Sequence, residues 1–311
     1  MERKVIVVGG GPAGYTTGIY LARADLKPLI LAGEKAGGQL MLTTEIENFP
    51  GIPEGTLGPD LMQRMREQAE KFGAEILNED VIEVDLNNKT KMVKTRDGVY
   101  EAETVVLALG AKAKMLGIGE EKFFGRGLST CAVCDAAFFR NKRVVVVGGG
   151  DAAMEDALAL IKFAESVTII HRREVFRASK IMQERVLSNN KVDVMWNSEV
   201  VAVRGESKIE SVMIKNTKTG KEIEMMMDGL FLAVGHEPET ELLKGKVDLD
   251  EKGFLRVGFD KNYPTMTSVA GVFGAGDMVD WRYKQAITAA GMGCMAALDA
   301  ERYMGEALGW H

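Results

Sequence analysis

A glycine-rich turn between a predicted strand and a predicted helix is the feature that most constrains this fold. Residues 4–8 form an apolar stretch, residues 9–14 read Gly-Gly-Gly-Pro-Ala-Gly, and a helical pattern runs on to Arg23, before a second strand near residues 28–31. Glycines at these positions permit a tight turn, close approach of the backbone to a pyrophosphate, and close packing of the helix on the strand. The helix N-terminus would then direct free N–H groups at the phosphate. The segment predicts the opening β-α-β unit of a nucleotide-binding fold.

The same pattern returns 139 residues later, from Gly9 to Gly148. A strand is predicted at residues 143–147, a glycine turn at 148–153, a helix at 154–163 and a strand at 167–170. A repeat of this length predicts two successive nucleotide-binding domains and not a short-period solenoid. The fold class expected is therefore α/β, with two Rossmann-like three-layer domains. An ordinary glycine-rich turn is the alternative for each copy alone, and the flanking strand and helix weigh against it.

The two copies differ at the position that usually meets the ribose. The first copy has Glu34 about 20 residues beyond Gly14, and a carboxylate there accepts ribose hydroxyls and repels a 2′-phosphate. The second copy has His171, Arg172 and Arg173, with Arg177 following. Guanidinium groups offer forked donors that suit a phosphate, so this copy is predicted to bind NADP. A solvated basic loop is the alternative.

FAD is the nucleotide expected in the first copy, because a flavin mediates hydride transfer from NADPH to a disulfide. The apolar segment 272–277 supports this interpretation, since it ends in Gly276 and Asp277, and an aspartate at a strand end can bind the ribityl chain. The NADP domain would then be an insertion. We expect residues 1–112 and 242–311 to form the FAD domain and residues 113–241 the NADPH domain, with hinges near 111–115 and 235–241.

The pair Cys131 and Cys134 is the centre of the predicted chemistry. This Cys-x-x-Cys spacing places two thiols within disulfide reach at the first turn of a helix, whose N-terminus lowers the pKa of the first thiol. Asp135 follows directly and could move protons during exchange. The small residues Ala132 and Val133 leave room for a flavin ring. We therefore predict Cys131, Cys134 and Asp135 as the catalytic residues.

The cysteine pair has two other possible interpretations. A structural zinc site needs four ligands, and only Cys294, His171, His236 and His311 remain, none of which completes a second paired motif. No metal is therefore expected. A pair of unreactive buried cysteines would leave its place beside two nucleotide sites as a coincidence. Cys294 stands alone in an apolar helical stretch and is interpreted as a packing residue.

Composition excludes several classes of partner. The net charge of -6 disfavours nucleic acid, where a basic face supplies most of the affinity. No apolar run approaches the roughly 20 residues that span a bilayer, and the N-terminus lacks the architecture of a signal peptide. Three cysteines do not make a disulfide framework. These features predict a cytoplasmic protein without membrane or nucleic-acid partners.

With these motifs in place, the chain resembles the low-molecular-weight thioredoxin reductases almost end to end. The segments that carry the resemblance are residues 9–14, 37–40, 47–51, 131–135, 148–153, 171–179 and 271–277. The resemblance implies that NADPH reduces FAD, that FAD reduces the Cys131–Cys134 disulfide, and that this pair reduces thioredoxin. It assigns Cys134 to the flavin and Cys131 to the partner disulfide, with Asp135 as the acid/base.

The resemblance and the motifs together predict the cofactor contacts. Around FAD we expect Gly9, Gly11, Pro12, Ala13, Gly14, Glu34, Gly38, Gln39, Asn48, Ala108, Gly110, Gly276, Asp277, Lys284, Gln285 and Ala286. Around NADPH we expect Gly148, Gly150, Asp151, Ala152, Ala153, His171, Arg172, Arg173 and Arg177. The family is homodimeric, and its NADP domain rotates against the FAD domain. The chain departs from the family at Val133, Ala136, Ala137 and Lys284; Ala137 stands where some members have an aromatic residue that docks thioredoxin.

Other functions stay open at this point. The chain could reduce another small dithiol protein, such as a glutaredoxin-like one. A flavin dithiol oxidase would need no NADP site, so the arginine cluster argues against it, and a ferredoxin-NADP reductase would lack the cysteine pair. A passive nucleotide-binding redox sensor is the non-enzyme alternative, and the pair with its adjacent Asp135 argues against it.

Overall fold

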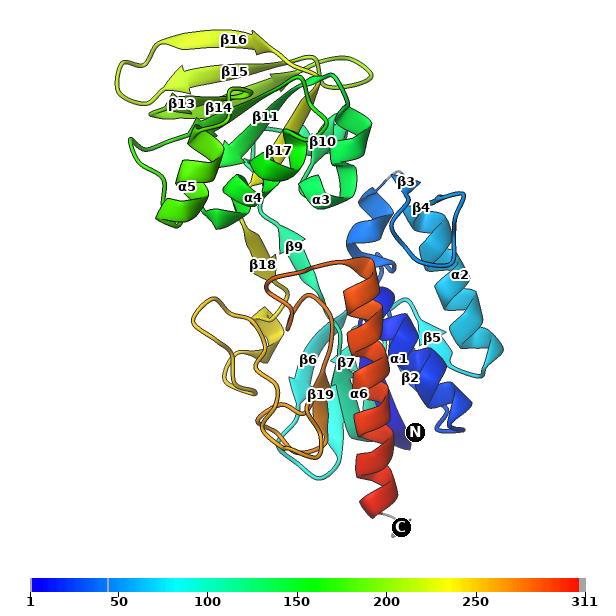
Figure 1. Cartoon of the computed structure of the whole chain (residues 1–311). Helices are drawn as coiled ribbons and strands as arrows, with labels where there is room; N and C mark the ends of the chain where they lie inside the picture. Colours follow the sequence, from blue (N-terminus) through cyan, green and yellow to red (C-terminus); the bar gives the residue numbers. More distant parts are fainter. Residues whose placement is uncertain (1, 44, 308–311) are drawn as a thin grey trace. The chain divides into compact units, whose positions relative to one another are not determined.

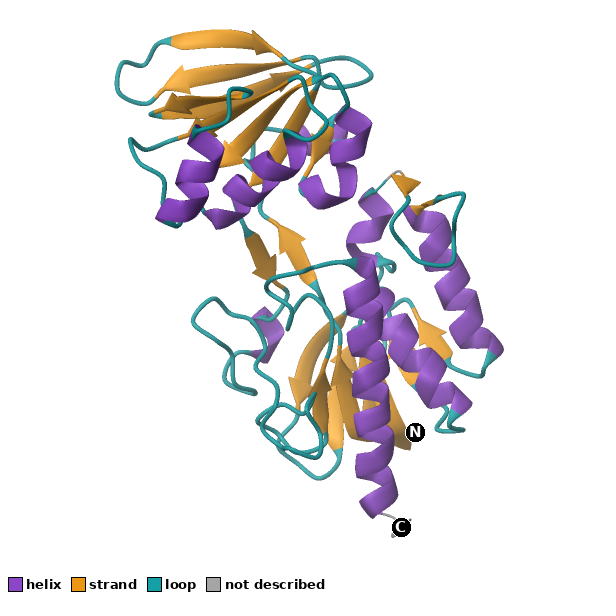
Figure 2. Ribbon diagram, viewed as in Figure 1, coloured by secondary structure: helices purple, strands orange, loops and turns teal. Residues whose placement is uncertain are grey.

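The computed structural model describes residues 2–43 and 45–307 and divides the chain into two compact units. Unit 1 comprises the residues up to 112 together with those from 237 onward, and unit 2 comprises residues 113–236. The α/β class predicted from the repeated glycine turns is confirmed, because each unit is built on a mainly parallel sheet (Figures 1 and 2). The second crossing between the units falls five residues before the expected boundary at 241, because residues 239 and 240 already bond within unit 1.

Unit 1 is organised around a seven-stranded sheet in the order β5-β2-β1-β8-β7-β6, with β19 added beside β8. The pairs β1/β2, β1/β8, β2/β5 and β8/β19 are parallel, whereas β6/β7 and β7/β8 are antiparallel. The strand bounds are β1 Glu2–Val8, β2 Leu29–Leu31, β5 Glu75–Leu77, β6 Val81–Asp85, β7 Lys91–Thr95, β8 Val99–Leu107 and β19 Val272–Gly274.

The sheet of unit 1 is buried on both faces. Along β1, Val5 and Val7 enter the core beneath the helices, while Ile6 and Val8 enter the core on the opposite face. A parallel strand covered on both sides needs such a continuous apolar run. These strands could therefore be predicted from the sequence. The helices are α1 Pro12–Arg23, α2 Gly58–Lys71 and α6 Ala286–Ala307, and a short hairpin joins β3 Glu45–Ile46 to β4 Thr56–Leu57.

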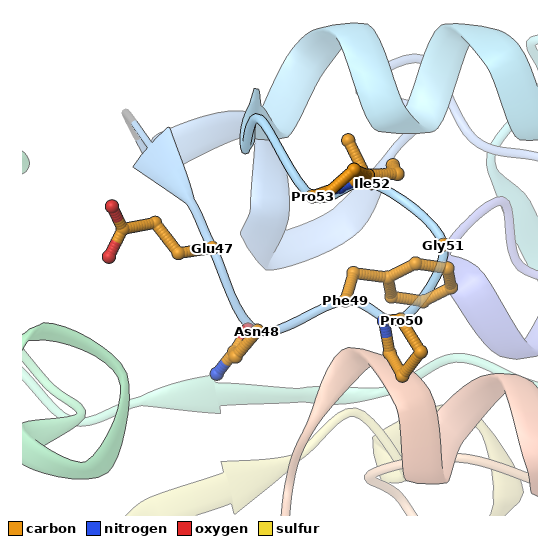
Figure 3. A pocket seen from close by; sticks show the side chains of 7 residues that line it. All are labelled: Glu47, Asn48, Phe49, Pro50, Gly51, Ile52 and Pro53. Atoms are coloured by element: carbon orange, nitrogen blue, oxygen red, sulfur yellow. The ribbon is translucent and has the colours of Figure 1, made fainter.

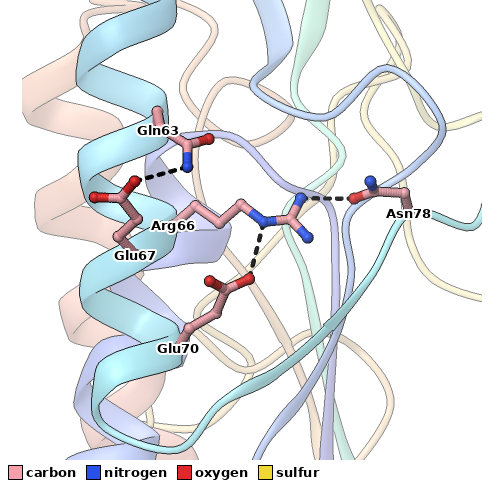
Figure 4. Close-up of polar contacts among 5 residues, drawn as sticks. All are labelled: Gln63, Arg66, Glu67, Glu70 and Asn78. Carbon is pink, nitrogen blue, oxygen red and sulfur yellow. Dashed lines mark hydrogen bonds and ion pairs between the residues drawn. The ribbon is translucent and has the colours of Figure 1, made fainter.

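A polar network fastens α2 to the segment that follows β5. The guanidinium of Arg66 lies between Glu70, with Nε 3.0 Å from Oε1, and Asn78, whose Oδ1 is 2.6 Å from Nη1 (Figure 4). Gln63 donates to Glu67 one turn earlier on the same helix. Arg66 thereby holds the start of the segment that continues to Asp80.

Unit 2 is built on a five-stranded parallel sheet in the order β10-β17-β11-β12-β13. Its strands are β10 Leu128–Ser129, β11 Arg143–Gly148, β12 Ser166–His171, β13 Val192–Trp196 and β17 Gly229–Ala233. Its helices are α3 Ala132–Asp135, α4 Asp151–Leu160 and α5 Lys180–Leu187, with the 3-10 helices η2 Glu120–Phe123 and η3 Ala136–Phe139. Helix α4 begins three residues before the predicted start, because Gly150 is already its N-cap.

The other face of this sheet is covered mainly by strands. The antiparallel strands β14 Ser198–Arg204, β15 Ser211–Asn216 and β16 Glu222–Met226 form a separate three-stranded sheet. Val200, Val212 and Ile214 of this sheet share a core with Val145 and Val147 of β11. Unit 2 therefore has three layers, as expected, but one of them is a small sheet.

The two chain crossings pair with each other. Strands β9 Ala111–Ala113 and β18 His236–Pro238 form a two-stranded sheet. On the unit 1 side, Glu239 donates its N–H to the carbonyl of Gly110 at 3.0 Å; on the unit 2 side, Lys114 donates to Gly235 at 2.9 Å. In the described part of the chain, no helix has both the length and the apolar character needed to cross a membrane.

Candidate active site and nucleotide cradles

The two predicted redox cysteines form a disulfide. Cys131 and Cys134 are bonded, with their Cα atoms 5.3 Å apart. Cys131 is the N-cap of α3, as the spacing predicted, and its sulfur accepts a hydrogen bond from the backbone N–H of Cys134 at 3.2 Å. Both cysteines are half-buried, whereas Val133 between them is 71% exposed. The disulfide therefore lies at the surface of its own unit.

Two side chains that the sequence did not single out hold the start of α3. The hydroxyl of Ser129 accepts the N–H of Cys131 at 3.0 Å, and Oδ1 of Asp156 on α4 accepts the N–H of Ala132 at 3.3 Å. These contacts use backbone donors that a helix start leaves without intrahelical partners. Asp156 is 24 residues away along the chain, so no local pattern could have marked it; Ser129, two residues before Cys131, could have been read as a turn residue.

Asp135 has an altered acidity. Burial raises the pKa of its carboxyl, and a hydrogen bond from Ser129 opposes that rise. A carboxyl group next in sequence to Cys134, and protonated at higher pH than an ordinary aspartate, is suited to hold a proton for thiol chemistry. Its role in catalysis stays a prediction.

The first glycine turn is a tight backbone junction with one open side. A Cβ at Gly9 would lie 2.1 Å from the carbonyl oxygen of Ala108, and one at Gly14 would lie 1.9 Å from that of Gly9. A Cβ at Gly11 would meet nothing within 4 Å. Gly9 and Gly14 thus serve packing, whereas Gly11 borders open space where the helix α1 begins at Pro12 and Ala13.

Other predicted FAD contacts of unit 1 gather near this turn. The N–H of Gly37 donates to the carbonyl of Gly10 at 2.9 Å, which brings the 3-10 helix η1 (Gly38–Leu42), with Gln39, beside the turn. A Cβ at Gly276 would lie 2.9 Å from the Cβ of Ala13. Asp277 therefore follows directly on a residue that touches α1. Gly110 closes the end of β8 in a left-handed conformation, with φ of 76°.

Asp277 carries a buried polar atom without a partner. Its Oδ1 is inaccessible and makes no hydrogen bond with a described residue. Burial, with Asp280 nearby, raises its pKa from 3.8 to about 6, and Lys284 opposes this. An unsatisfied buried oxygen is costly unless a ligand donor meets it. A hydroxyl-rich ligand chain would supply such donors.

The loop of residues 47–53 curves around a shallow hollow of about 330 Å³. Figure 3 shows the ring of Phe49 inside this curve and Glu47 pointing away from it. Asn48 is the predicted FAD contact in the lining, and its Nδ2 lies 3.5 Å from Oε1 of Gln285, just before Ala286 opens α6. Two predicted contacts far apart in sequence are thereby brought together. The hollow is lined by this one loop, so we do not regard it as the nucleotide cradle.

Glu34 is held at the end of β2 by an aspartate that the sequence did not single out. Oδ1 of Asp80 accepts the N–H of Glu34 at 2.9 Å, and the exposed carboxylate of Glu34 lies 3.6 Å from Nη1 of Arg96. Exposed pairs of this kind contribute little energy. The side chain of Glu34 remains available at the strand end, where ribose hydroxyls are met in this fold.

The second glycine turn repeats the arrangement in unit 2. A Cβ at Gly150 would meet nothing within 4 Å, whereas one at Gly148 would lie 2.8 Å from the Cβ of Ala153. Asp151 and Ala152 begin α4 and are exposed. Arg172, Arg173 and Arg177 are also exposed, beyond the end of β12, and among the described residues none of the three forms an ion pair. His171, by contrast, is 6% exposed.

The remaining site predictions are placed as follows. Lys284 precedes α6 in a left-handed conformation, and its Nζ donates to the carbonyl of Trp281 at 2.7 Å. Cys294 is a free, half-buried thiol on α6. Within residues 2–43 and 45–307, no three His, Cys, Asp or Glu side chains are grouped to hold a metal ion. His311 lies outside the described residues.

Comparison with known proteins gives the family. Residues 3–293 match the family described as pyridine nucleotide-disulphide oxidoreductase. The thioredoxin reductase of Streptomyces clavuligerus is 52% identical, over 97% of this chain and 94% of its own length. The bifunctional thioredoxin reductase/thioredoxin of Mycobacterium leprae is 51% identical over 98% of this chain and 67% of its own length. The crystal structure of thioredoxin reductase from Streptococcus pyogenes is 39% identical, with a TM-score of 0.91 and coverage of 98% of this chain and 99% of that one. This chain therefore belongs to the pyridine nucleotide-disulphide oxidoreductase family and, within it, to the thioredoxin reductases.

Proposed function

We propose that this chain is an NADPH-dependent thioredoxin-disulfide reductase with FAD as its resident cofactor. The observation that carries the proposal is the Cys131–Cys134 disulfide at the start of α3, followed directly by a carboxyl group whose pKa is raised. The partner proposed is a thioredoxin or a thioredoxin-like protein. In the Mycobacterium leprae relative, reductase and thioredoxin are named as parts of one protein, which supports this choice of partner.

The residues present fit FAD in unit 1 and NADPH in unit 2. Unit 1 has open space at Gly11. It also has a buried oxygen on Asp277 without a partner, and ligand hydroxyls would bind to that oxygen. Unit 2 has open space at Gly150 and three exposed guanidinium groups for the 2′-phosphate. In this assignment Glu34 would bind the adenosine ribose of FAD and Asp277 its ribityl chain. Bound FAD supplies the two-electron chemistry that connects NADPH with a disulfide.

The chain's own residues perform the exchange with the partner. Two electrons and two protons convert the Cys131–Cys134 disulfide into a dithiol. The Cys131 thiolate attacks one sulfur of the partner disulfide, breaks that bond and forms a mixed disulfide. Cys134 then attacks the sulfur of Cys131, so that the internal disulfide forms again and the partner leaves as a dithiol. Asp135 holds a proton and delivers it to a departing sulfur.

We also propose that the protein is a homodimer in the cytoplasm. Helix α6 exposes Ile287, Met295 and Leu298 at helical spacing, and the neighbouring α1 exposes Tyr20. An apolar stripe of this kind is typical of a protein contact. Sedimentation of wild type and Met295→Asp checks the dimer, with Ile82→Asp on β6 as a control at another exposed apolar position. A monomeric wild-type protein would refute the dimer.

The function is tested with the purified holoenzyme and a panel of oxidised dithiol proteins. We expect NADPH oxidation to depend on a thioredoxin and to be lost in Cys131→Ser and Cys134→Ser. Cys294→Ser is the matched control, because Cys294 is the free cysteine, and it should retain activity. Turnover with a glutaredoxin-like protein and with no thioredoxin would show that the partner is the glutaredoxin-like protein. Turnover with oxygen alone would identify an oxidase, and a flavin that NADPH does not bleach would refute the reductase altogether.

A further inference from the structure

The imidazole of His171 is enclosed by the second glycine turn and an aromatic cluster. A Cβ at Gly149 would lie 2.2 Å from Cε1 of the ring, so the ring fills the space that a side chain at Gly149 would need. Phe176 and Trp196 lie 5.3 Å and 6.1 Å from the ring, centroid to centroid. His171 thus has little surface left for a ligand, although its motif groups it with the neighbouring arginines.

The ring nitrogen Nε2 of His171 bonds to the protein backbone. Nε2 lies 3.0 Å from the carbonyl oxygen of Val175, and because a carbonyl can only accept, Nε2 carries the proton. Burial lowers the pKa of His171, and the charges of Arg177 and Arg173 act in the same direction. The backbone hydrogen bonds of the ring with Val175 and Gly148 act to raise its pKa. Burial is the larger effect and keeps the imidazole neutral, so the ring links the two backbone segments by its Nε2 bond to Val175 and by its packing against Gly149.

Those two segments are the second glycine turn (residues 148–150) and the arginine loop, which we define as residues 172–177. The ends of the arginine loop have their own backbone tethers. Arg177 donates its N–H to the carbonyl of Gly149 at 2.7 Å, and the carbonyl of Arg173 accepts from Asn197 at 3.2 Å. Just beyond the loop, Asp151 accepts both the N–H and the hydroxyl of Ser179 at 2.9 Å.

The tip of the arginine loop depends on fewer contacts. The side chain of Val175 is 68% exposed and adds little packing, while its carbonyl is bonded by His171. Phe176 is buried and lies 4.3 Å from Trp196 between ring centroids. The tip is therefore held by the aromatic contact of Phe176, the histidine bond to Val175 and one exposed ion pair between Glu174 and Lys218, and exposed pairs contribute little energy.

We propose that His171 is a positioning residue for the 2′-phosphate site, because its imidazole fixes the tip of the arginine loop against the second glycine turn. This inference rests on the proposed function, in which Arg172, Arg173 and Arg177 bind the 2′-phosphate of NADPH. Without the bond to Val175, a smaller fraction of molecules would hold the arginine loop in the conformation that binds the 2′-phosphate. The apparent affinity for the phosphate would fall in proportion to that fraction. The glycine turn remains anchored on β11, so the common part of NAD and NADP would keep its binding site.

The test compares the affinities of NADP⁺ and NAD⁺ for the oxidised holoenzyme by titration calorimetry. His171→Phe keeps the aromatic packing and removes the bond to Val175, while His171→Gln restores a donor. We expect His171→Phe to weaken NADP⁺ about tenfold and NAD⁺ by less than about twofold, with His171→Gln within about threefold of wild type for NADP⁺. Val175→Ala is the matched control, because it retains the carbonyl and should leave both affinities unchanged.

Two results would overturn the inference, and a further variant separates it from the proposed function. Equal losses for both nucleotides in His171→Phe, or no loss of NADP⁺ affinity, would show that the bond does not position the phosphate site. If His171→Phe does not fold, the same comparison is made with His171→Gln and His171→Ala. Arg172→Ala/Arg173→Ala tests the assignment beneath: unchanged NADP⁺ binding there refutes the 2′-phosphate site and the inference together. If the double arginine variant loses NADP⁺ binding but His171→Phe binds NADP⁺ as tightly as wild type, the inference about His171 is refuted and the 2′-phosphate site stands.

Discussion

The backbone N–H of Cys134 points at the sulfur of Cys131, with 3.2 Å between nitrogen and sulfur. Cys131 is also the N-cap of α3, and the aligned backbone dipoles of a helix favour a negative charge at that end. Both features stabilise a thiolate on Cys131, and neither acts equally on Cys134. The two cysteines are therefore inequivalent before any partner arrives.

After reduction, Cys131 should be alkylated faster than Cys134 near neutral pH. The thiolate is the reactive form, and the N–H of Cys134 and the helix start favour it on Cys131. Brief treatment with iodoacetamide followed by peptide mass spectrometry measures the ratio, with Cys294 as an internal reference. Preferential labelling of Cys134 would reverse the roles proposed for the pair.

Asp135→Asn should slow the reduction of thioredoxin by about 10²-fold, the usual contribution of a positioned acid or base. Because burial raises the pKa of Asp135, the wild-type carboxyl keeps its proton to higher pH than an ordinary aspartate. The loss should therefore shrink as the pH rises past the pKa of Asp135, where the wild type too lacks the proton. The rate at which NADPH bleaches the flavin serves as the control and should be unchanged; a pH-independent deficit would contradict an acid role.

Asp277→Asn should stabilise the FAD-free protein at neutral pH. The folded-state pKa of about 6 exceeds the ordinary 3.8, so the native state binds the proton more tightly than the unfolded state. Stability from this group is complete below pH 3.8 and is lost as the pH rises through 6, at an order of magnitude of ~3 kcal/mol. Urea unfolding of the apoprotein should show a stabilised variant at pH 8 and no difference at pH 3.5.

The matched control for Asp277→Asn is Asp193→Asn, at an exposed position on β13. It should show no such pH dependence. With FAD added, the order should reverse, because the wild-type carboxylate then has ligand hydroxyls to accept. A variant that binds FAD as tightly as wild type would remove Asp277 from the cofactor site.

Gly11→Ala and Gly14→Ala should separate cofactor binding from folding. A Cβ at Gly14 would overlap the carbonyl oxygen of Gly9, so Gly14→Ala should destabilise the apoprotein by about 2 kcal/mol or more. Gly11 has an extended backbone and free space around its Cβ, so Gly11→Ala should change apoprotein stability by less than ~0.5 kcal/mol. Its FAD affinity should nevertheless fall, as measured by flavin retention during dialysis. Full retention would show that the space at Gly11 is not used by FAD.

The sequence predicted those parts of the fold that repeat a local pattern. Strand β11 carries four consecutive valines because both faces of its sheet are buried, and such a run is legible without a structure. The glycine turns could also be recognised in the sequence, because the fold requires glycine at a position such as Gly14, where a Cβ has no room. The cysteine pair was placed correctly at the first turn of a helix for the same local reason.

The support around these motifs could not be predicted, because it comes from distant segments. Asp156 reaches α3 from α4, and Asp80 reaches Glu34 across 46 residues. The small sheet β14–β16 was also missed, since its strands are short and are not flanked by a motif as distinct as the glycine-rich turns. Burial reverses one natural interpretation as well: His171 shares a motif with exposed arginines, yet its ring is enclosed.

The hydrogen bond from Glu239 to Gly110 has a consequence for how such a protein could arise and be re-engineered. The chain leaves unit 1 and returns to it at neighbouring points, so all of unit 2 occupies a place that a hairpin turn of a few residues could fill. Closing a loop around a folded body whose ends already meet adds little entropic cost to unit 1. Unit 2 could therefore be removed and replaced by a short turn, or exchanged for another folded domain whose ends are adjacent.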